Sequence, residues 1–202
     1  VIDGLYEAYL KIRRGEPIPS APPETLVLET RSTTSEAEHT DTECVARFME
    51  AVSEKASALG MTSSTFTRPA GDGGNMTTAR DLMRMLVEAA GYKEIARIWG
   101  KDTRAIPVLG ANARTVTVNT TVTDPDLEGA YHIFGGKTGS WAGTEDLVIV
   151  AETESHGMVA GVVMDATSGA ARFDAMKELL DVVDGKGTEV TSAVSAIACA
   201  VP

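Results

Sequence analysis

The sequence has 202 residues, 43% of them hydrophobic and 23% charged, and 29 acidic residues outnumber 18 lysines and arginines to give a net charge of −11. A chain of this length and apolar content is expected to bury a core and to form one domain, which excludes a disordered or fibrous protein. Nucleic-acid binding requires clustered basic residues, so nucleic acid is excluded as a partner. No apolar run approaches the ~20 residues that span a bilayer, so we expect no transmembrane segment.

Two features bear on the origin of the chain. Cys44 and Cys199 can form one disulfide or remain two thiols, and their number does not decide the redox compartment. The sequence begins at Val1 rather than at a methionine, and residues 1–3 look like the interior of a structural element. We therefore expect a processed or excised piece of a longer protein.

Helices are predicted in the first half of the chain. Apolar residues at helical spacing indicate a helix over residues 1–14. A stronger apolar stripe runs from about residue 41 to 59, where Thr40 and Glu43 match a capping box and Gly60 matches a left-handed C-cap. Shorter helices are predicted from near Thr77 to Gly91 and over Tyr92–Trp99.

The periodicity changes to that of strands in the second half. Strands are predicted over residues 104–108 and 114–119, with residues 109–112 as a hairpin turn. Three more are predicted at Tyr131–Lys137, Asp146–Glu152 and Gly157–Asp165. The gaps between these three are too short for crossover helices, so neighbouring strands should be antiparallel.

The chain is predicted to close with a helix and a short tail. Ser168 is placed as the N-cap of a helix over Gly169–Val183, and Gly185 ends it. Residues 185–202 are expected to form a terminal strand or a frayed end. Helices followed by antiparallel strands and a closing helix predict an α+β domain, with an antiparallel sheet flanked by helices.

Several candidate motifs fail on inspection. Residues 135–140 contain Gly-Lys-Thr but lack the upstream glycine and the following helix of a phosphate-binding loop. Residues 124–129 begin like a calcium loop but have glycine where the bidentate Glu belongs, so an acidic turn is predicted. The three histidines, His39, His132 and His156, lack metal-ligand spacing. We therefore expect no metal and no cofactor.

Lys137-Thr138-Gly139, at the end of a predicted strand, fits ligand binding better than these motifs do. A lysine there projects an ammonium that holds a carboxylate, the threonine adds a hydroxyl, and the glycine lets a ligand backbone approach the strand. Three residues alone also fit a surface hairpin with a solvated lysine.

Five segments together resemble the D-alanyl-D-alanine carboxypeptidases, which are low-molecular-weight penicillin-binding proteins of the β-lactamase/transpeptidase superfamily. The resemblance covers about 70% of the chain, from residue 41 to 184. The matching segments occur in the family's order at Met49–Phe66, Thr77–Leu82, Asn119–Thr121, Gly136–Gly139 and Ala170–Leu180.

The resemblance is incomplete at the catalytic motifs. Family enzymes use Ser-x-x-Lys for the nucleophile and its base, Ser-x-Asn as a proton relay, and Lys-Thr-Gly. No Ser-x-x-Lys occurs in this sequence. Matching residues 5–10 to the family's nucleophile helix puts Val1 and Gly4 at the serine and lysine positions, and this pair cannot form an acyl-enzyme. The relay position falls on Thr33 and Ser35, without the asparagine.

Two interpretations of this gap stay open. Either the chain is a divergent homologue that has lost the acyl-enzyme step, or the Ser-x-x-Lys motif lies upstream of Val1. The resemblance implies a penicillin-binding-protein-like domain over residues 1–184 and a tail over 185–202. It also implies that Lys137, Thr138 and Gly139 bind a terminal carboxylate, and that the backbone N–H of Ser140 forms part of an oxyanion hole.

The activity implied by the resemblance is that of a serine-type D-Ala-D-Ala carboxypeptidase-like hydrolase, with peptidoglycan stem peptides or β-lactams as ligands, outside the cytoplasm. The alternative is a non-catalytic module that binds peptide or peptidoglycan with the same cleft.

Overall fold

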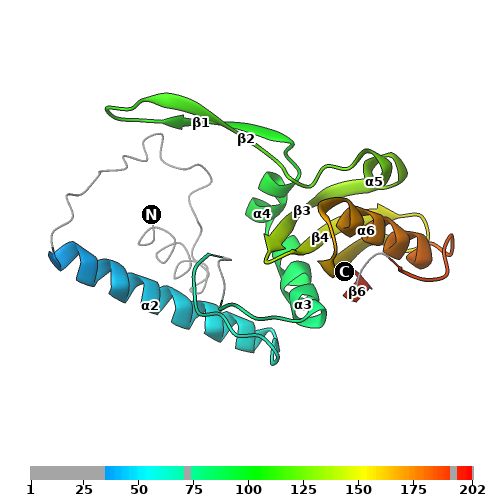
Figure 1. The fold of residues 1–202 in the computed structure, drawn as a ribbon, viewed down its shortest axis with the longest axis horizontal. Coiled ribbons are helices and arrows are strands. Elements are labelled where there is room, and N and C mark those ends of the chain that lie inside the picture. Colours follow the sequence, from blue (N-terminus) through cyan, green and yellow to red (C-terminus); the bar gives the residue numbers. More distant parts are fainter. Residues whose placement is uncertain (1–34, 71–73, 192–194, 202) are drawn as a thin grey trace.

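A four-stranded antiparallel sheet between helices forms the body of the protein (Figure 1). The computed structural model describes residues 35–70, 74–191 and 195–201. The expected helix over residues 1–14 therefore lies outside the described residues. The elements are α2 (Ser35–Ala58), α3 (Ala79–Ala90), α4 (Lys93–Trp99), β1 (Thr103–Val108), β2 (Arg114–Asn119), α5 (Pro125–Ala130), β3 (His132–Trp141), β4 (Thr144–Thr153), β5 (Gly157–Ala166), α6 (Gly169–Val183) and β6 (Ser195–Ala200).

The sheet has the order β3-β4-β5-β6, and every neighbouring pair is antiparallel. Side chains alternate across it: Leu147 and Ile149 of β4 pack with α6, whereas Val150 packs with α3. The central strands β4 and β5 are therefore apolar on both faces, as a sheet covered by helices on both sides requires. This arrangement confirms the predicted α+β architecture.

The N-cap of α6 and the ends of α2 and α3 agree with the predictions. The Ser168 hydroxyl accepts a hydrogen bond from Ala171 N at 3.1 Å, and α6 spans the predicted Gly169–Val183. The side chain of Thr78 caps α3, and Gly91 ends that helix. Gly60, which follows the last turn of α2, has a φ of +71°, so the predicted left-handed C-cap is confirmed.

Two predictions that concern helices are wrong. The helix α2 begins at Ser35, so Thr40 lies inside it rather than at a cap, and Glu43 pairs with Arg47 at 2.5 Å. The acidic segment expected to be a turn is the helix α5, because Asp124 caps it through hydrogen bonds from Asp126 N and Leu127 N.

The strands β1 and β2 form a separate hairpin that projects beyond α4 (Figure 1). Its strands and its turn match the predicted ranges closely. Arg104 lies opposite Val118 and Ile106 opposite Val116, so these four side chains share one face. That face is exposed: Ile106, Val116 and Val118 are 43%, 36% and 49% accessible.

The tail contributes a strand, β6, which pairs with β5 from Val159 to Met164. A terminal strand was one of the two expected forms of this segment. The two cysteines form no disulfide with each other; Cys44 is half-buried on α2, and Cys199 is exposed on β6. Within the described residues, every helix is too short or too polar to cross a membrane.

Candidate functional site

The Lys-Thr-Gly motif lies within β3, which is an outer strand of the sheet. The strand was predicted to end at Lys137, but it continues to Trp141 because Thr138, Gly139 and Ser140 pair with Leu147, Asp146 and Glu145 of β4. The Lys-Thr-Gly motif therefore lies in paired strand and not in a loop. Lys137 is exposed, and Thr138 is buried.

Lys137 lines a groove of about 430 Å³ between β3, the end of α4 and the base of the β1–β2 hairpin. Gly135 lets α4 approach β3 this closely. Its φ is +150°, and a Cβ there would lie 2.8 Å from the Trp99 carbonyl carbon. The groove is lined by Ile98, Trp99, Lys101, Arg104, Ile106, Val118, Asn119, Thr120, Thr121, Val122, Gly136 and Lys137.

Thr121 and Thr138 join two of the segments that the resemblance singled out. Their hydroxyl oxygens lie 2.6 Å apart, and either can donate. Thr121 follows β2 and also lines the groove, so a tertiary hydrogen bond fixes the Asn119–Thr121 segment against the Lys-Thr-Gly strand. The hydroxyl of Thr138 thus lies next to the groove while the threonine itself is buried.

Arg172 of α6 holds the backbone that follows Lys137. Its Nη1 donates to the Gly139 carbonyl at 3.1 Å, to Ser140 Oγ at 3.2 Å and to Glu145 Oε2 at 2.6 Å. Ser140 Oγ in turn donates to Glu145 Oε2. The Arg172 side chain is 12% exposed and that of Glu145 is 23% exposed, so water weakens this pair little.

Sequence reasoning assigned no role to Arg172, Glu145 or Thr121. One signal did point to Arg172: it lies in the first turn of a helix, where the helix dipole disfavours a cation. A cation at that position is expected to have an acidic partner outside the helix, and Glu145 is that partner.

The residues expected at the nucleophile and relay positions are not brought together with Lys137 by any described contact. Val1, Gly4 and Thr33 lie outside the described residues. Ser35 is the first residue of α2, and its side chain is likewise outside the description. Figure 1 shows this end of α2 directed away from the sheet.

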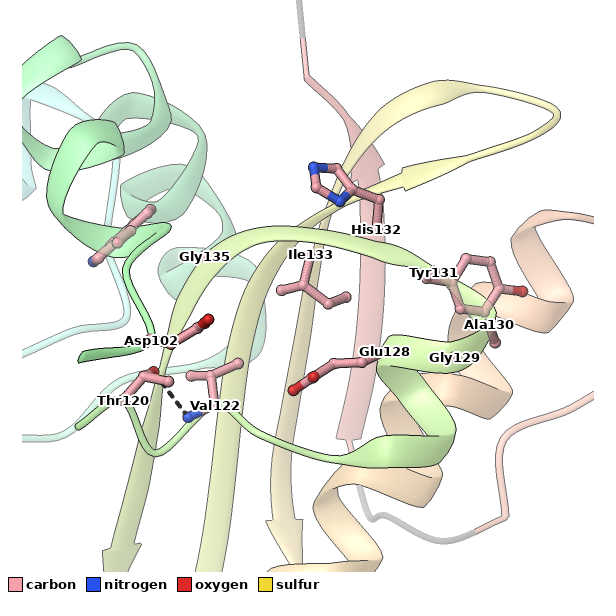
Figure 2. A pocket seen from close by; sticks show the side chains of 11 residues that line it. Asp102, Thr120, Val122, Glu128, Gly129, Ala130, Tyr131, His132, Ile133 and Gly135 are labelled. Carbon is pink, nitrogen blue, oxygen red and sulfur yellow. Dashed lines mark hydrogen bonds between the residues drawn. The ribbon is translucent and has the colours of Figure 1, made fainter.

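A second cavity of about 450 Å³ adjoins the groove and shares Trp99, Thr120 and Val122 with it. Figure 2 shows the carboxylates of Asp102 and Glu128 pointing into this space from opposite sides. Glu128 is already used locally, because it accepts a hydrogen bond from Asp124 N at 3.1 Å. Among the described residues, no group of three or more His, Cys, Asp or Glu side chains is placed to hold a metal ion.

Comparison with solved structures relates this arrangement to a point mutant of the Streptomyces K15 DD-transpeptidase. The two chains superpose with a TM-score of 0.56 at 21% sequence identity, over 78% of this chain and 56% of the other. This chain has the fold of a DD-transpeptidase. It spans little more than half the length of that relative, and neither the family models nor the curated proteins searched give a match.

Proposed function

We propose that this chain carries the ligand-binding strand of a D-Ala-D-Ala carboxypeptidase-like protein that acts on peptidoglycan stem peptides outside the cytoplasm. The observation that carries the proposal is an exposed Lys137 on an outer strand, beside a groove and followed by two residues that tertiary contacts hold in place. Thr121 holds the Thr138 side of the motif, and Arg172 holds Gly139.

Each residue of the motif has a role in this proposal. The Lys137 ammonium binds the terminal carboxylate of the peptide, and the hydroxyl of Thr138 adds a hydrogen bond. Gly139 has no side chain to keep the ligand backbone away from the strand. The backbone N–H of Ser140 stabilises the developing oxyanion of an acyl transfer. Ser35 and Thr33 stand at the relay position by resemblance.

A non-catalytic binding module is the second candidate, and one observation favours it. No Ser-x-x-Lys occurs in the sequence, so the 202 residues alone lack that nucleophile and base. A module of this kind would use the same groove and the same Lys137 to hold a peptide carboxylate without cleaving it.

Substitution of Lys137 tests the shared part of both candidates. Lys137→Ala is expected to weaken binding of a peptide ending in D-Ala-D-Ala about tenfold or more, because it removes the charged partner of the carboxylate. Calorimetry measures the binding of this peptide and, for comparison, of the same peptide with an amidated C-terminus. Lys93→Ala, which removes an exposed lysine at the start of α4, is the matched control. Unchanged binding in Lys137→Ala would contradict both candidates.

A labelled penicillin separates the two candidates. Covalent labelling of the chain supports the hydrolase, since an acyl-enzyme requires a nucleophile. Peptide binding that depends on Lys137, without covalent labelling, supports the module.

A further inference from the structure

The groove beside Lys137 is positively charged in a strongly acidic protein. The chain has a net charge of −11, yet the residues that line the groove include three cations, Lys101, Arg104 and Lys137, and no carboxylate. The adjoining cavity has the opposite character, because Asp102 and Glu128 line it. The segregation of charge along one edge of β3 favours an anion in the groove.

Lys101 and Arg104 are unpaired within the part of the chain that the structure describes. Neither side chain makes a hydrogen bond or an ion pair there. The half-buried cations Arg172 and Lys177 differ, because each binds a carboxylate. The positive charge at the base of the hairpin is therefore available to a ligand.

The rest of the groove wall is apolar. Ile98 is 51% exposed, and Ile106 and Val118 line the groove from the apolar face of the hairpin. A two-stranded hairpin is marginally stable in water by itself, so covering this face would stabilise it. A ligand that fits this wall has an apolar group as well as negative charge.

We infer that the groove binds an extended acidic peptide that carries a second carboxylate upstream of its C-terminal one. Lys137 takes the terminal carboxylate, as in the proposed function on which this inference rests. Lys101 and Arg104 take the second carboxylate. Ile98, Ile106 and Val118 contact an apolar side chain between the two.

Two synthetic peptides test the second carboxylate. Both have an acetylated N-terminus and a Leu-D-Ala-D-Ala end, and they differ only in having Glu or Gln before the leucine. The Glu peptide is expected to bind the full chain about five- to tenfold more tightly at low salt, since exposed charge pairs contribute modestly. The difference in affinity between the two peptides should become smaller in 0.5 M NaCl because salt screens exposed charges.

Matched double variants locate the effect. Lys101→Ala/Arg104→Ala should abolish the preference for Glu, whereas Lys93→Ala/Arg97→Ala removes the same charge from α4 outside the groove and should preserve it. Thermal melting followed by circular dichroism checks that both variants fold. Equal binding of the two peptides, or a preference that survives Lys101→Ala/Arg104→Ala, would overturn the inference.

The same measurements separate this inference from the proposed function. If the Gln peptide binds through Lys137 and Glu adds nothing, only the inference fails. If the Glu preference depends on Lys101 and Arg104 but not on Lys137, the proposed function fails and the second site stands. If neither peptide binds, both fail. A dimer in light scattering that Arg104→Ala dissociates would assign the groove to a second copy of the chain and overturn the inference.

Discussion

Arg172 determines the position of the backbone immediately after Lys137. One nitrogen of its guanidinium contacts Gly139, Ser140 and Glu145. Its Nε is buried and has no hydrogen-bond partner among the described residues, which costs free energy. The Arg172–Glu145 ion pair at 2.6 Å, together with the fixed position of β3, offsets this cost. We interpret Arg172 as a positioning residue for the Lys137 site.

Arg172→Leu is expected to destabilise the protein by about 2–4 kcal/mol, since it leaves Glu145 half-buried without its cation. It should also weaken the Lys137-dependent peptide complex several-fold, because Gly139 loses its hydrogen bond. Urea unfolding measures the first effect and calorimetry the second.

A double-mutant cycle with Glu145→Gln separates charge from position. Arg172→Leu/Glu145→Gln should recover part of the stability but not the affinity, since the Gly139 contact stays lost. Unchanged peptide affinity in both Arg172 variants would exclude a positioning role.

The turn between β4 and β5 is fastened to the end of α6 by Asp184. Its carboxylate accepts hydrogen bonds from Ser155 Oγ at 2.7 Å, Ser155 N at 3.0 Å and Glu154 N at 3.3 Å, and Lys186 lies 3.2 Å away. Burial alone would raise the pKa of Asp184, but these donors favour the charged form and lower the pKa from 3.8 to about 2.

This lowered pKa predicts an acid-sensitive contribution to stability. The folded-state pKa is below the unfolded value, so the stabilisation is complete above pH 4 and is lost as the pH falls towards 2. A shift of this size corresponds to about 2 kcal/mol. Asp184→Asn should therefore be less stable than the wild type by about that amount at pH 7. The difference between the two proteins in the free energy of unfolding, measured with urea, should become smaller below pH 4. A constant difference from pH 7 to pH 2 would contradict the assignment.

The sequence predicted elements well where local chemistry and tertiary packing agree. Ser168 was the correct cap because the residues before it belong to a strand and its turn. The Thr40–Glu43 box failed because Ser35–His39 also favour a helix, and continuing a helix costs less than starting one. The end of β3 was misplaced because pairing with β4 imposes strand structure on a glycine-rich segment with little β-propensity of its own.

The site was predicted only in its local part. Lys137 and its neighbours form a short motif that the sequence displays directly. The contacts Thr121–Thr138 and Arg172–Glu145 join residues 17 and 27 positions apart, and no periodicity reports such pairs. Arg104 gained significance only from the register that places it beside Val118 on the groove face, and Lys101 only from the tertiary packing that places it in the groove wall.

At the scale of the whole molecule, stability is unevenly distributed. The strands β4 and β5 are covered on both faces, β6 is an outer strand, and the β1–β2 hairpin has almost entirely exposed strands. Local opening therefore costs most in the centre of the sheet and least in the hairpin.

Amide hydrogen exchange should follow this order. The amides of β4 and β5 are expected to exchange slowest, those of β6 faster, and those of β1 and β2 fastest, as measured by mass spectrometry on the full chain. Exchange of the hairpin as slow as that of β5 would show that another surface covers it.

The outer position of β3 has a consequence for the behaviour of the protein in solution. An open strand edge offers its backbone groups to any second strand, and natural proteins often place a lysine there to discourage uncontrolled pairing between copies. Lys137 is exposed on such an edge. Lys137 therefore discourages pairing between copies as well as having the proposed role in ligand binding. Lys137→Ala should remove both, so the variant is expected to aggregate more readily than the wild type, and saturating the wild-type edge with peptide should improve its solubility.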